Sequence, residues 1–488
     1  MSNIVAICQK NDSKYPSKEE MIYPAENYPE FDGYFEKVAK ENSPFKMMRE
    51  LFLMMELDIE NYGRSTWNPL GEYIEPDQTI LIKPNLVLDV NEAGGVECLY
   101  TQPSVVAAVI PYVVKALGER GQIIIADAPM QECDFDKLID QSGYSDIVSY
   151  YRSKGITISL VDLRGLKTKV VAGVHQQSAV LGKGKLVKLN ELSEHASLDS
   201  TLLKKDRITN YDPSELSKHH NSHIHEYLVA NEALEADVII NMPKPKTHRL
   251  AGATISMKNF VGIATRKEYL PHHRIGSVSE SGDEYQKKSI LLNLNSKILD
   301  LKNKHLSNRK YLLAGASLYL GKAISWTDRN LISHEEHRVG AWYGNDTIWR
   351  TIVDLNRIAL YSDKNGIIKD TVQRKILVIA DMIIMGEKEG PCYPSPRDVG
   401  ILAMGSNTAI FDEAIATIMG FSTKKIPLFS NLKNNDNIPI AVDEAGLIIS
   451  NNINWNGKNY KEIKRESTLN LTPTSGWKGH IELDTDEK

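Results

Sequence analysis

The stretch 241–274 concentrates basic and histidine side chains in a chain that is acidic overall. It holds seven Lys or Arg residues against one acid, Glu268, and three histidines, whereas the 488-residue chain has a formal net charge of −5. Fixed cations suit an anion, and Gly252 and Gly262 would let backbone amides approach it closely. The charges are interleaved with apolar and small residues, unlike those of a solvated basic face. We therefore expect an anion site here.

Side-chain type suggests a role for each candidate residue. His248 and His272 are general acid–base candidates, because nearby cations would lower their pKa towards that of neutral imidazole. Asp127 is the third catalytic candidate, since it ends a predicted strand. The residues expected to hold the phosphate groups of a substrate are Lys83, Asn85, Lys244, Lys246, Lys258, Asn259, His273 and Arg274.

Several carboxylates lie beside glycines or at predicted strand ends. If two or three of them converge near phosphate, they would bind Mg²⁺ or another divalent metal, which is the expected cofactor. Each could instead cap a helix or stabilise a turn. The metal-ligand candidates are Asp127, Asp283, Glu284, Asp346 and Glu387.

Histidine and cysteine spacing gives no established metal motif. The tract 219–225 contains four histidines, but neither HExxH nor facial-triad spacing occurs, so an ordinary loop is favoured and the role of the tract is left open. The four cysteines, Cys8, Cys98, Cys133 and Cys392, form no CxxC pair. We expect no Cys-ligated iron–sulfur cluster.

Short apolar runs and amphipathic segments predict the elements that position these residues. Strands are predicted at 79–88, 122–126, 156–161, 236–241 and 375–380, and helices at 45–57, 103–117, 135–142, 144–153 and 409–419. This order implies an α/β fold with a mostly parallel Rossmann-like sheet and helices on both faces. Asp127 and Asp381 then fall at the carboxyl ends of strands, where open α/β sheets bind ligands.

The remaining segments complete the predicted organisation. We expect an irregular N-terminal arm (1–75), a first part of the α/β core (76–165) and a large polar insertion (166–235). A second part of the core (236–450) carries the basic, histidine-rich site, and a polar tail (451–488) follows. A Gly/Pro-rich loop is expected at 386–396, directly after the strand that ends at Asp381.

Composition narrows the function classes. The pI near 6.3 argues against general nucleic-acid binding. No apolar run reaches the roughly 18–20 residues of a membrane span, and no signal peptide is evident, so we expect a cytoplasmic protein without membrane insertion. GxGxxG, GxxxxGK[ST] and GxSxG are absent, which removes the usual signatures of dinucleotide dehydrogenases, P-loop ATPases and α/β-hydrolases.

A set of motifs occurs in order from about Asn68 to Phe421: NPLGEYIEPDQTILIKPNLV, DAPMQECDF, ADVIINMPKPKTH, GATISMKNFVGI, LPHHRIGS, GDEYQ, GNDTIWRTIVDLNR and IFDEAIATIMGF. They resemble the bacterial family called domain of unknown function 362, and most of all its long members found with surface-polysaccharide genes. The resemblance implies that the polar positions of these motifs are functional, but it gives none of them a role. Some members carry a ferredoxin-like module with clustered cysteines, which this chain lacks, so no electron-transfer role is implied.

The first functional hypothesis is an enzyme, a transferase or isomerase, that acts on a phosphorylated or nucleotide-linked sugar in bacterial cell-surface polysaccharide biosynthesis. Its partner would be that small anionic substrate, and a homodimer is compatible with the sequence. One alternative is a metal-dependent isomerase or redox enzyme with histidine ligands. Another is a non-catalytic polysaccharide-binding or assembly protein. The polysaccharide part depends on the family resemblance, not on the residues of the site.

Overall fold

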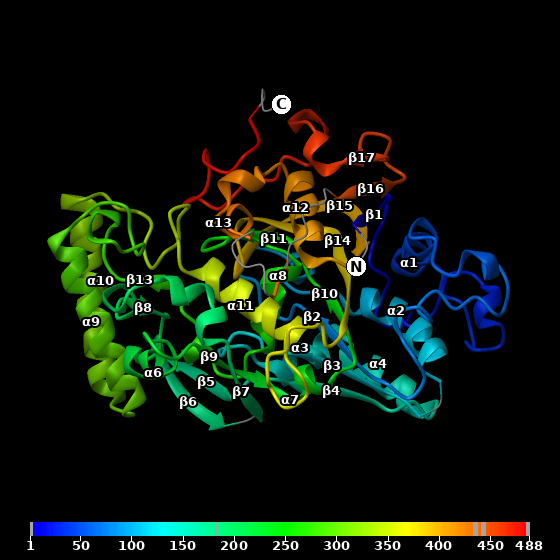
Figure 1. Cartoon of the computed structure of the whole chain (residues 1–488), viewed down its shortest axis with the longest axis horizontal. Coiled ribbons are helices and arrows are strands. Elements are labelled where there is room, and N and C mark those ends of the chain that lie inside the picture. Colours follow the sequence, from blue (N-terminus) through cyan, green and yellow to red (C-terminus); the bar gives the residue numbers. More distant parts are fainter. Residues whose placement is uncertain (1–2, 119, 181–182, 433–437, 441–445, 485–488) are drawn as a thin grey trace.

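The computed structural model describes residues 3–118, 120–180, 183–432, 438–440 and 446–484. Its centre is an 11-stranded sheet with helices packed around it (Figure 1). The strands of this sheet are β1 (Ile4–Gln9), β2 (Thr79–Pro84), β3 (Gln122–Asp127), β4 (Ile158–Asp162), β10 (Val238–Met242), β11 (Lys246–His248), β12 (Gly252–Thr254), β14 (Lys375–Glu389), β15 (Tyr393–Gly405), β16 (Leu447–Ser450) and β17 (Lys458–Asn459).

The main path of the sheet is β17-β16-β1-β15-β14-β10-β2-β3-β4. The run from β14 through β10, β2 and β3 to β4 is parallel throughout. Parallel strands need crossover connections, and the helices supply them. The predicted α/β fold with a mostly parallel sheet is confirmed.

Helices cover both faces of the sheet, because alternate strand residues point to opposite sides. Leu81 and Val378 pack in one core with α7, α8, α11, α12 and α13, whereas Ile82 and Leu377 pack in a second core with α1 to α4. The helices are α1 (Ser43–Met54), α2 (Pro103–Leu117), α3 (Phe135–Ser142), α4 (Tyr144–Ser153), α5 (Ser200–Leu203), α6 (Pro213–His219), α7 (Asn231–Glu235), α8 (Ser256–Asn259), α9 (Ile290–Ser307), α10 (Tyr311–Thr327), α11 (Ile348–Tyr361), α12 (Thr408–Met419) and α13 (Pro427–Ser430).

The N-terminal segment contributes to the sheet, which the sequence analysis did not predict. β1 lies between β15 and β16, antiparallel to the first and parallel to the second. Its partners lie about 400 residues away in the chain, so local sequence patterns could not identify them. The following segment carries Tyr15 to the carboxyl edge of the parallel strands.

The loop predicted at 386–396 is for the most part a β-hairpin. β14 continues to Glu389 and pairs with β15 in antiparallel register, with an irregularity between Met382 and Ile384. The antiparallel partner satisfies the backbone groups of β14 beyond the edge of the parallel sheet. Asp381 therefore lies within a long strand and not at its end.

Segment 166–235 forms small sheets beside the main one. β5 (Leu166–Val171) pairs with β6 (Val174–Val180), and β7 (Gly184–Lys188) pairs with β9 (Glu226–Ala230). β8 (Asp206–Arg207) pairs with β13 (His273–Arg274), which joins this segment to the basic stretch. In the described part of the chain, no helix is long and apolar enough to cross a membrane.

The C-terminal segment packs on the core despite its polar sequence. Trp455 and Trp477 are buried, and the indole N–H of Trp477 donates to the carbonyl of Arg249 at 2.7 Å. The Trp477 ring covers Gly252, where any Cβ would lie 3.1 Å from it. The final residues, 485–488, lie outside the described part.

Candidate active site

Lys83 and Asp127 meet at the carboxyl ends of the neighbouring parallel strands β2 and β3. Lys83 Nζ lies 2.7 Å from Asp127 Oδ1, and both side chains are buried. The amide of Leu86 donates to the other carboxylate oxygen at 2.6 Å. Gly262 closes over the pair, since a Cβ at this position would lie 1.9 Å from Asp127 Oδ1 and 2.7 Å from Lys83 Nζ. Only glycine permits this approach.

Buried amides extend the network from the ion pair to the start of α8. Lys83 Nζ also donates to Asn259 Oδ1 at 3.2 Å, and Asn259 Nδ2 donates to Asn241 Oδ1 at 2.7 Å. Asn241 Nδ2 in turn donates to the carbonyl of Ser256 at 2.9 Å. These hydrogen bonds satisfy the buried amides of Asn241 and Asn259. They hold both residues of the basic stretch beside β2.

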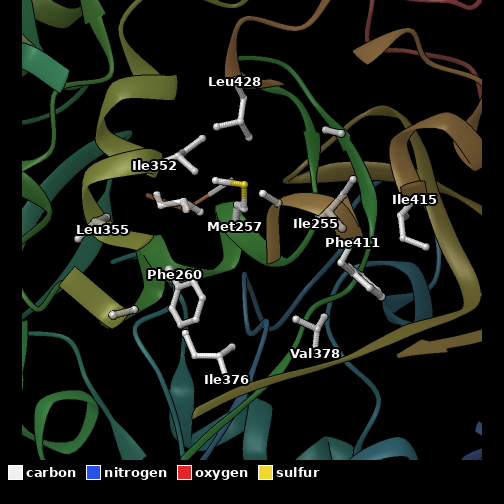
Figure 2. Close-up of a cluster of buried hydrophobic side chains, with 14 of the residues drawn as sticks. Ile255, Met257, Phe260, Ile352, Leu355, Ile376, Val378, Phe411, Ile415 and Leu428 are labelled. Carbon is white, nitrogen blue, oxygen red and sulfur yellow. The ribbon is translucent and has the colours of Figure 1, made fainter. Parts of the chain in front are cut away.

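Helix α8 is held in place at both its polar and its apolar side. The Asp412 carboxylate accepts hydrogen bonds from the amides of Ser256 and Met257, each at 2.8 Å. Burial raises the pKa of Asp412 to about 7. Figure 2 shows Met257 within the apolar cluster formed by β14, α11, α12 and α13. Burial of Met257 leaves Lys258, the next residue, half-buried at the surface of that core.

A second ion pair lies beside the first. Lys244 Nζ is 3.0 Å from Asp381 Oδ2, with both side chains buried. Tyr15 bridges the pair, since its hydroxyl donates to Asp381 Oδ1 at 2.6 Å and accepts from Lys244 Nζ at 2.7 Å. Tyr15 was missed by the sequence analysis, and no spacing signal connects it to residues more than two hundred positions away.

Lys246 and Lys258 differ from these two lysines because neither pairs with a carboxylate within the part of the chain that the structure describes. Lys246 Nζ donates to Asn85 Oδ1 and to the carbonyl of Lys244. For Lys258, the described part of the chain offers no side-chain hydrogen bond or ion pair. The pKa of each is lowered to about 7. Burial is the main cause for both, followed by Lys244 for Lys246 and by Lys267 for Lys258.

Lys267 adds another cation to the same region, and the sequence analysis did not select it. Its Nζ donates to the carbonyls of Ala128 and Val261 at 3.0 and 3.2 Å. Burial lowers its pKa to about 8, opposed by the nearby Asp127 carboxylate and assisted by Lys83. The region therefore contains five lysines around two carboxylates, and we call Lys83, Lys244, Lys246, Lys258 and Lys267, together with His248 and His272, the lysine–histidine cluster.

The two histidines of the cluster are held by backbone groups. His248 Nδ1 accepts from the amides of Leu250 and Ala251, at 3.0 and 3.2 Å. His272 Nδ1 lies 2.7 Å from the carbonyl oxygen of Leu270. Burial, followed by the charge of Lys258, lowers the pKa of His248 well below 6.5 and that of His272 to about 3. Both rings are therefore neutral at pH 7.

Arg274 and three of the predicted metal ligands lie in a separate group. Arg274 Nη2 is 2.8 Å from Asp346 Oδ2 and 3.7 Å from Asp283 Oδ2. Asp283 also accepts from the hydroxyl of Thr347 at 2.5 Å, while Glu284 accepts from Ser296 at 2.7 Å. The bonds of Arg274 and Asp283 join β13 to the start of α11, and the bond of Glu284 joins the same segment to α9, so these contacts stabilise the fold.

The other predicted site residues are also apart from the cluster. His273 lines a cavity of about 30 Å³ with Arg207 and Glu284, room for about one water molecule. Glu387 accepts from the amide of Thr472 at 3.0 Å. Of the predicted carboxylates, Asp283 and Asp346 lie together beside Arg274, whereas Asp127 and Glu387 lie elsewhere. The residues that the structure describes contain no group of three or more His, Cys, Asp or Glu that could hold a metal ion.

A larger cavity of about 170 Å³ lies between the 335–343 and 475–480 segments, with Trp342, Tyr343 and His480 in its wall. None of its lining residues belongs to the lysine–histidine cluster. The cluster is therefore identified by its charge, burial and hydrogen bonding, not by the size of an opening.

Comparison with known proteins places the chain in a family. The sequence matches the family described as Domain of unknown function (DUF362) over residues 80–202 and 185–417. These ranges contain every residue of the lysine–histidine cluster and both of its carboxylates. Neither the curated proteins nor the solved structures gave a match. Because the match covers well over half of the chain, the protein belongs to the family Domain of unknown function (DUF362).

Proposed function

We propose that the protein is an enzyme that binds a phosphorylated small molecule at the lysine–histidine cluster and carries out transfer or isomerisation on it. One observation supports this most strongly. Lys83 and Lys244 are neutralised by Asp127 and Asp381, whereas no carboxylate of the described residues pairs with Lys246 or Lys258. Holding a cation away from water without a counterion costs free energy, so an anionic ligand at the buried Lys246 and the half-buried Lys258 would offset that cost.

The protein groups suggest how the substrate would be handled. Lys246 and Lys258 would take the phosphate oxygens, with Lys267 and the amide of Asn85 at the edge of the site. Burial and the charge of Lys258 lower the pKa of His272, and a phosphate bound at Lys258 would offset that charge, so that this ring could act as the base through Nε2. His248 would donate a hydrogen bond from Nε2 to an oxygen that gains charge. In an isomerisation the base removes a proton from one carbon and returns it to the neighbouring carbon. In a transfer it removes a proton from the acceptor hydroxyl, whose oxygen bonds to the transferred group while the phosphate-bearing group leaves with the electron pair of the broken bond.

The substrate class that we propose is a phosphorylated or nucleotide-linked sugar used in cell-surface polysaccharide biosynthesis in the cytoplasm. The phosphate part of this proposal depends on the lysines. The sugar and pathway part depends only on the resemblance to long members of the family. Mg²⁺ or another divalent cation would enter with the phosphate groups, since Asp127 and Asp381 are already engaged by lysines.

A thermal-shift screen of sugar phosphates and nucleotide sugars, with and without Mg²⁺, tests the binding step. A ligand at a hundred times its Kd should stabilise the protein by about 2.7 kcal/mol. Lys246→Met and Lys258→Met should abolish the shift. Lys424→Met, which changes an exposed lysine outside the cluster, should preserve it. The proposal is wrong if no phosphorylated compound shifts the wild type, or if both cluster variants keep the shift.

Asparagine variants separate catalysis from binding. In His272→Asn, the side-chain amide retains a donor for the Leu270 carbonyl but lacks the basic nitrogen. In His248→Asn, the side-chain oxygen retains an acceptor for the two backbone amides but lacks the distal N–H. Both variants should bind the ligand found in the screen and fail to convert it, as followed by ³¹P NMR. Equal conversion by wild type and both variants would exclude these catalytic roles.

A further inference from the structure

Helix α10 has its large apolar side chains on the outside. The residues that it buries are small: Ala314, Ser317 and Gly321. Its exposed residues recur at i, i+3/i+4 and i+7 and are almost all apolar: Leu312, Leu313, Ala316, Tyr319, Leu320, Ala323 and Trp326. Amphipathic helices of globular proteins normally show the opposite arrangement. The small residues allow close packing on α9, and no described part of the chain covers the large ones.

The exposure is extensive and lies at one end of the molecule. Leu312 is 92% exposed, Tyr319 60% and Trp326 63%, and the turn after α10 adds Leu331 at 67%. Figure 1 shows α9 and α10 side by side at the end of the molecule opposite to α1. A continuous apolar stripe of this kind marks an interaction surface, unlike single exposed apolar residues.

The charge around this stripe indicates what covers it. Residues 288–332 contain eight Lys or Arg and two acids, in a chain whose net charge is −5. Of the eight, Lys302 is buried and Lys288 pairs with Glu280, which leaves six at the surface of the hairpin. Both acids already have arginine partners outside the helical hairpin: Asp300 pairs with Arg207, and Asp328 lies 3.5 Å from Arg338. The hairpin formed by α9 and α10 is therefore a basic segment on an acidic protein. Two copies docked through it would bring like charges together, which disfavours a dimer.

We propose that the α9–α10 hairpin binds the surface of an anionic phospholipid membrane, with the stripe from Leu312 to Trp326 in the interfacial layer. An apolar face with tryptophan and leucine, flanked by lysine and arginine, is the pattern of helices that lie in the membrane plane. Lys322 and Arg309 can extend their charged ends towards phosphate headgroups. The 17-residue α10 lies parallel to the surface and does not cross the bilayer.

Vesicle flotation of the full-length protein tests the proposal. The wild type should bind vesicles of phosphatidylcholine with 30% phosphatidylglycerol, bind pure phosphatidylcholine far less, and dissociate as salt is raised. A Leu312→Asp/Trp326→Asp double variant should lower the partition coefficient at least about tenfold, because two apolar side chains lose their burial. The matched control is Ile453→Asp, since Ile453 is 88% exposed and lies outside the hairpin. This control should bind like the wild type.

Further variants separate lipid binding from the alternatives. The double variant Lys310→Glu/Lys322→Glu should lower the partition coefficient by at least about fivefold, because each lysine near the headgroups contributes about 1 kcal/mol. Lys258→Met should leave it unchanged, which would show that the lysine–histidine cluster is not the lipid site. All variants change exposed or half-buried positions, and an unchanged circular dichroism spectrum verifies folding. Equal flotation of the wild type and the Leu312→Asp/Trp326→Asp variant would overturn the proposal. So would a stable dimer that this variant dissociates, together with no vesicle binding.

Discussion

His248 and His272 are held in opposite tautomers. Nδ1 of His248 accepts two backbone N–H groups, so its proton must be on Nε2. Nδ1 of His272 faces a carbonyl oxygen, which can only accept, so that nitrogen carries the proton and Nε2 has the free lone pair. The backbone therefore makes one ring a donor and the other an acceptor at their distal nitrogens.

This arrangement predicts that the ring nitrogens of His248 and His272 show different ¹⁵N chemical-shift patterns. In protein labelled at histidine, His248 should show a protonated Nε2 and His272 a protonated Nδ1, with assignment by His248→Asn and His272→Asn. Neither ring should titrate between pH 6 and 8, because burial and Lys258 lower both pKa values. A charge change of either ring in that range would contradict the assignment.

Two lysines of the cluster, Lys83 and Lys258, should differ in their effect on stability. Lys83→Met leaves the buried Asp127 carboxylate without its cation and should lower the free energy of unfolding by about 3–5 kcal/mol. Lys258→Met removes a cation without a partner and should change it by less than about 1 kcal/mol. Urea unfolding followed by circular dichroism measures both. Equal losses would mean that Lys258 has a counterion in solution.

Tyr15 should matter for stability although it lies far from the cluster in sequence. Tyr15→Phe removes the hydroxyl that contacts Lys244, Asp381 and the amide of Ile384, and should cost about 1–3 kcal/mol. Tyr319→Phe, at a side chain 60% exposed, should stay within about 0.5 kcal/mol of the wild type. Thermal denaturation compares the two. A Tyr15→Phe variant as stable as the control would mean that water replaces the hydroxyl.

Local signals predicted the elements whose ends are determined by nearby residues. Helices α3 and α4 begin and end where the sequence indicated, because the Asp134 side chain caps the first and Gly143 separates the two in a left-handed conformation. The position of Asp127 at the carboxyl edge of the sheet followed from the same reasoning. Its ion pair with Lys83 did not, because the strand predicted at 79–88 placed Lys83 in the strand interior.

The parts of the fold and of the site that depend on contacts between distant segments could not be predicted from the sequence. The strand β1 and the contacts of Tyr15 require partners hundreds of residues away, for which no local pattern exists. The sequence also could not show that Asp283 and Asp346 would bind Arg274. Residue type alone predicted that Arg274 binds phosphate and that Asp283 and Asp346 bind a metal. In the folded chain these opposite charges lie together and form ion pairs with one another.

Gly262 should tolerate no side chain, because its position is filled by the Lys83–Asp127 pair. Gly262→Ala would place Cβ 1.9 Å from Asp127 Oδ1. The substitution should lower the free energy of unfolding by at least about 2 kcal/mol and should abolish ligand binding. Gly315→Ala is the matched control. The nearest atom to its Cβ lies 3.7 Å away, and alanine in α10 should add about 0.5–1 kcal/mol. Chemical denaturation should thus give changes of opposite sign, and a neutral Gly262→Ala would contradict the described packing.

Ligand binding at the cluster should take up protons, and affinity should fall as the pH rises above 7. The pKa values of free Lys246 and Lys258 are about 7, so both are largely uncharged at pH 8. A bound phosphate favours the charged form and raises both pKa values. Calorimetry with a nucleotide sugar, whose diphosphate does not titrate near neutral pH, in buffers of different ionisation enthalpy should show an uptake of up to about two protons at pH 8 and much less at pH 6. Lys246→Met should remove about one of these protons. Equal uptake at both pH values would mean that these lysines are charged before the ligand binds.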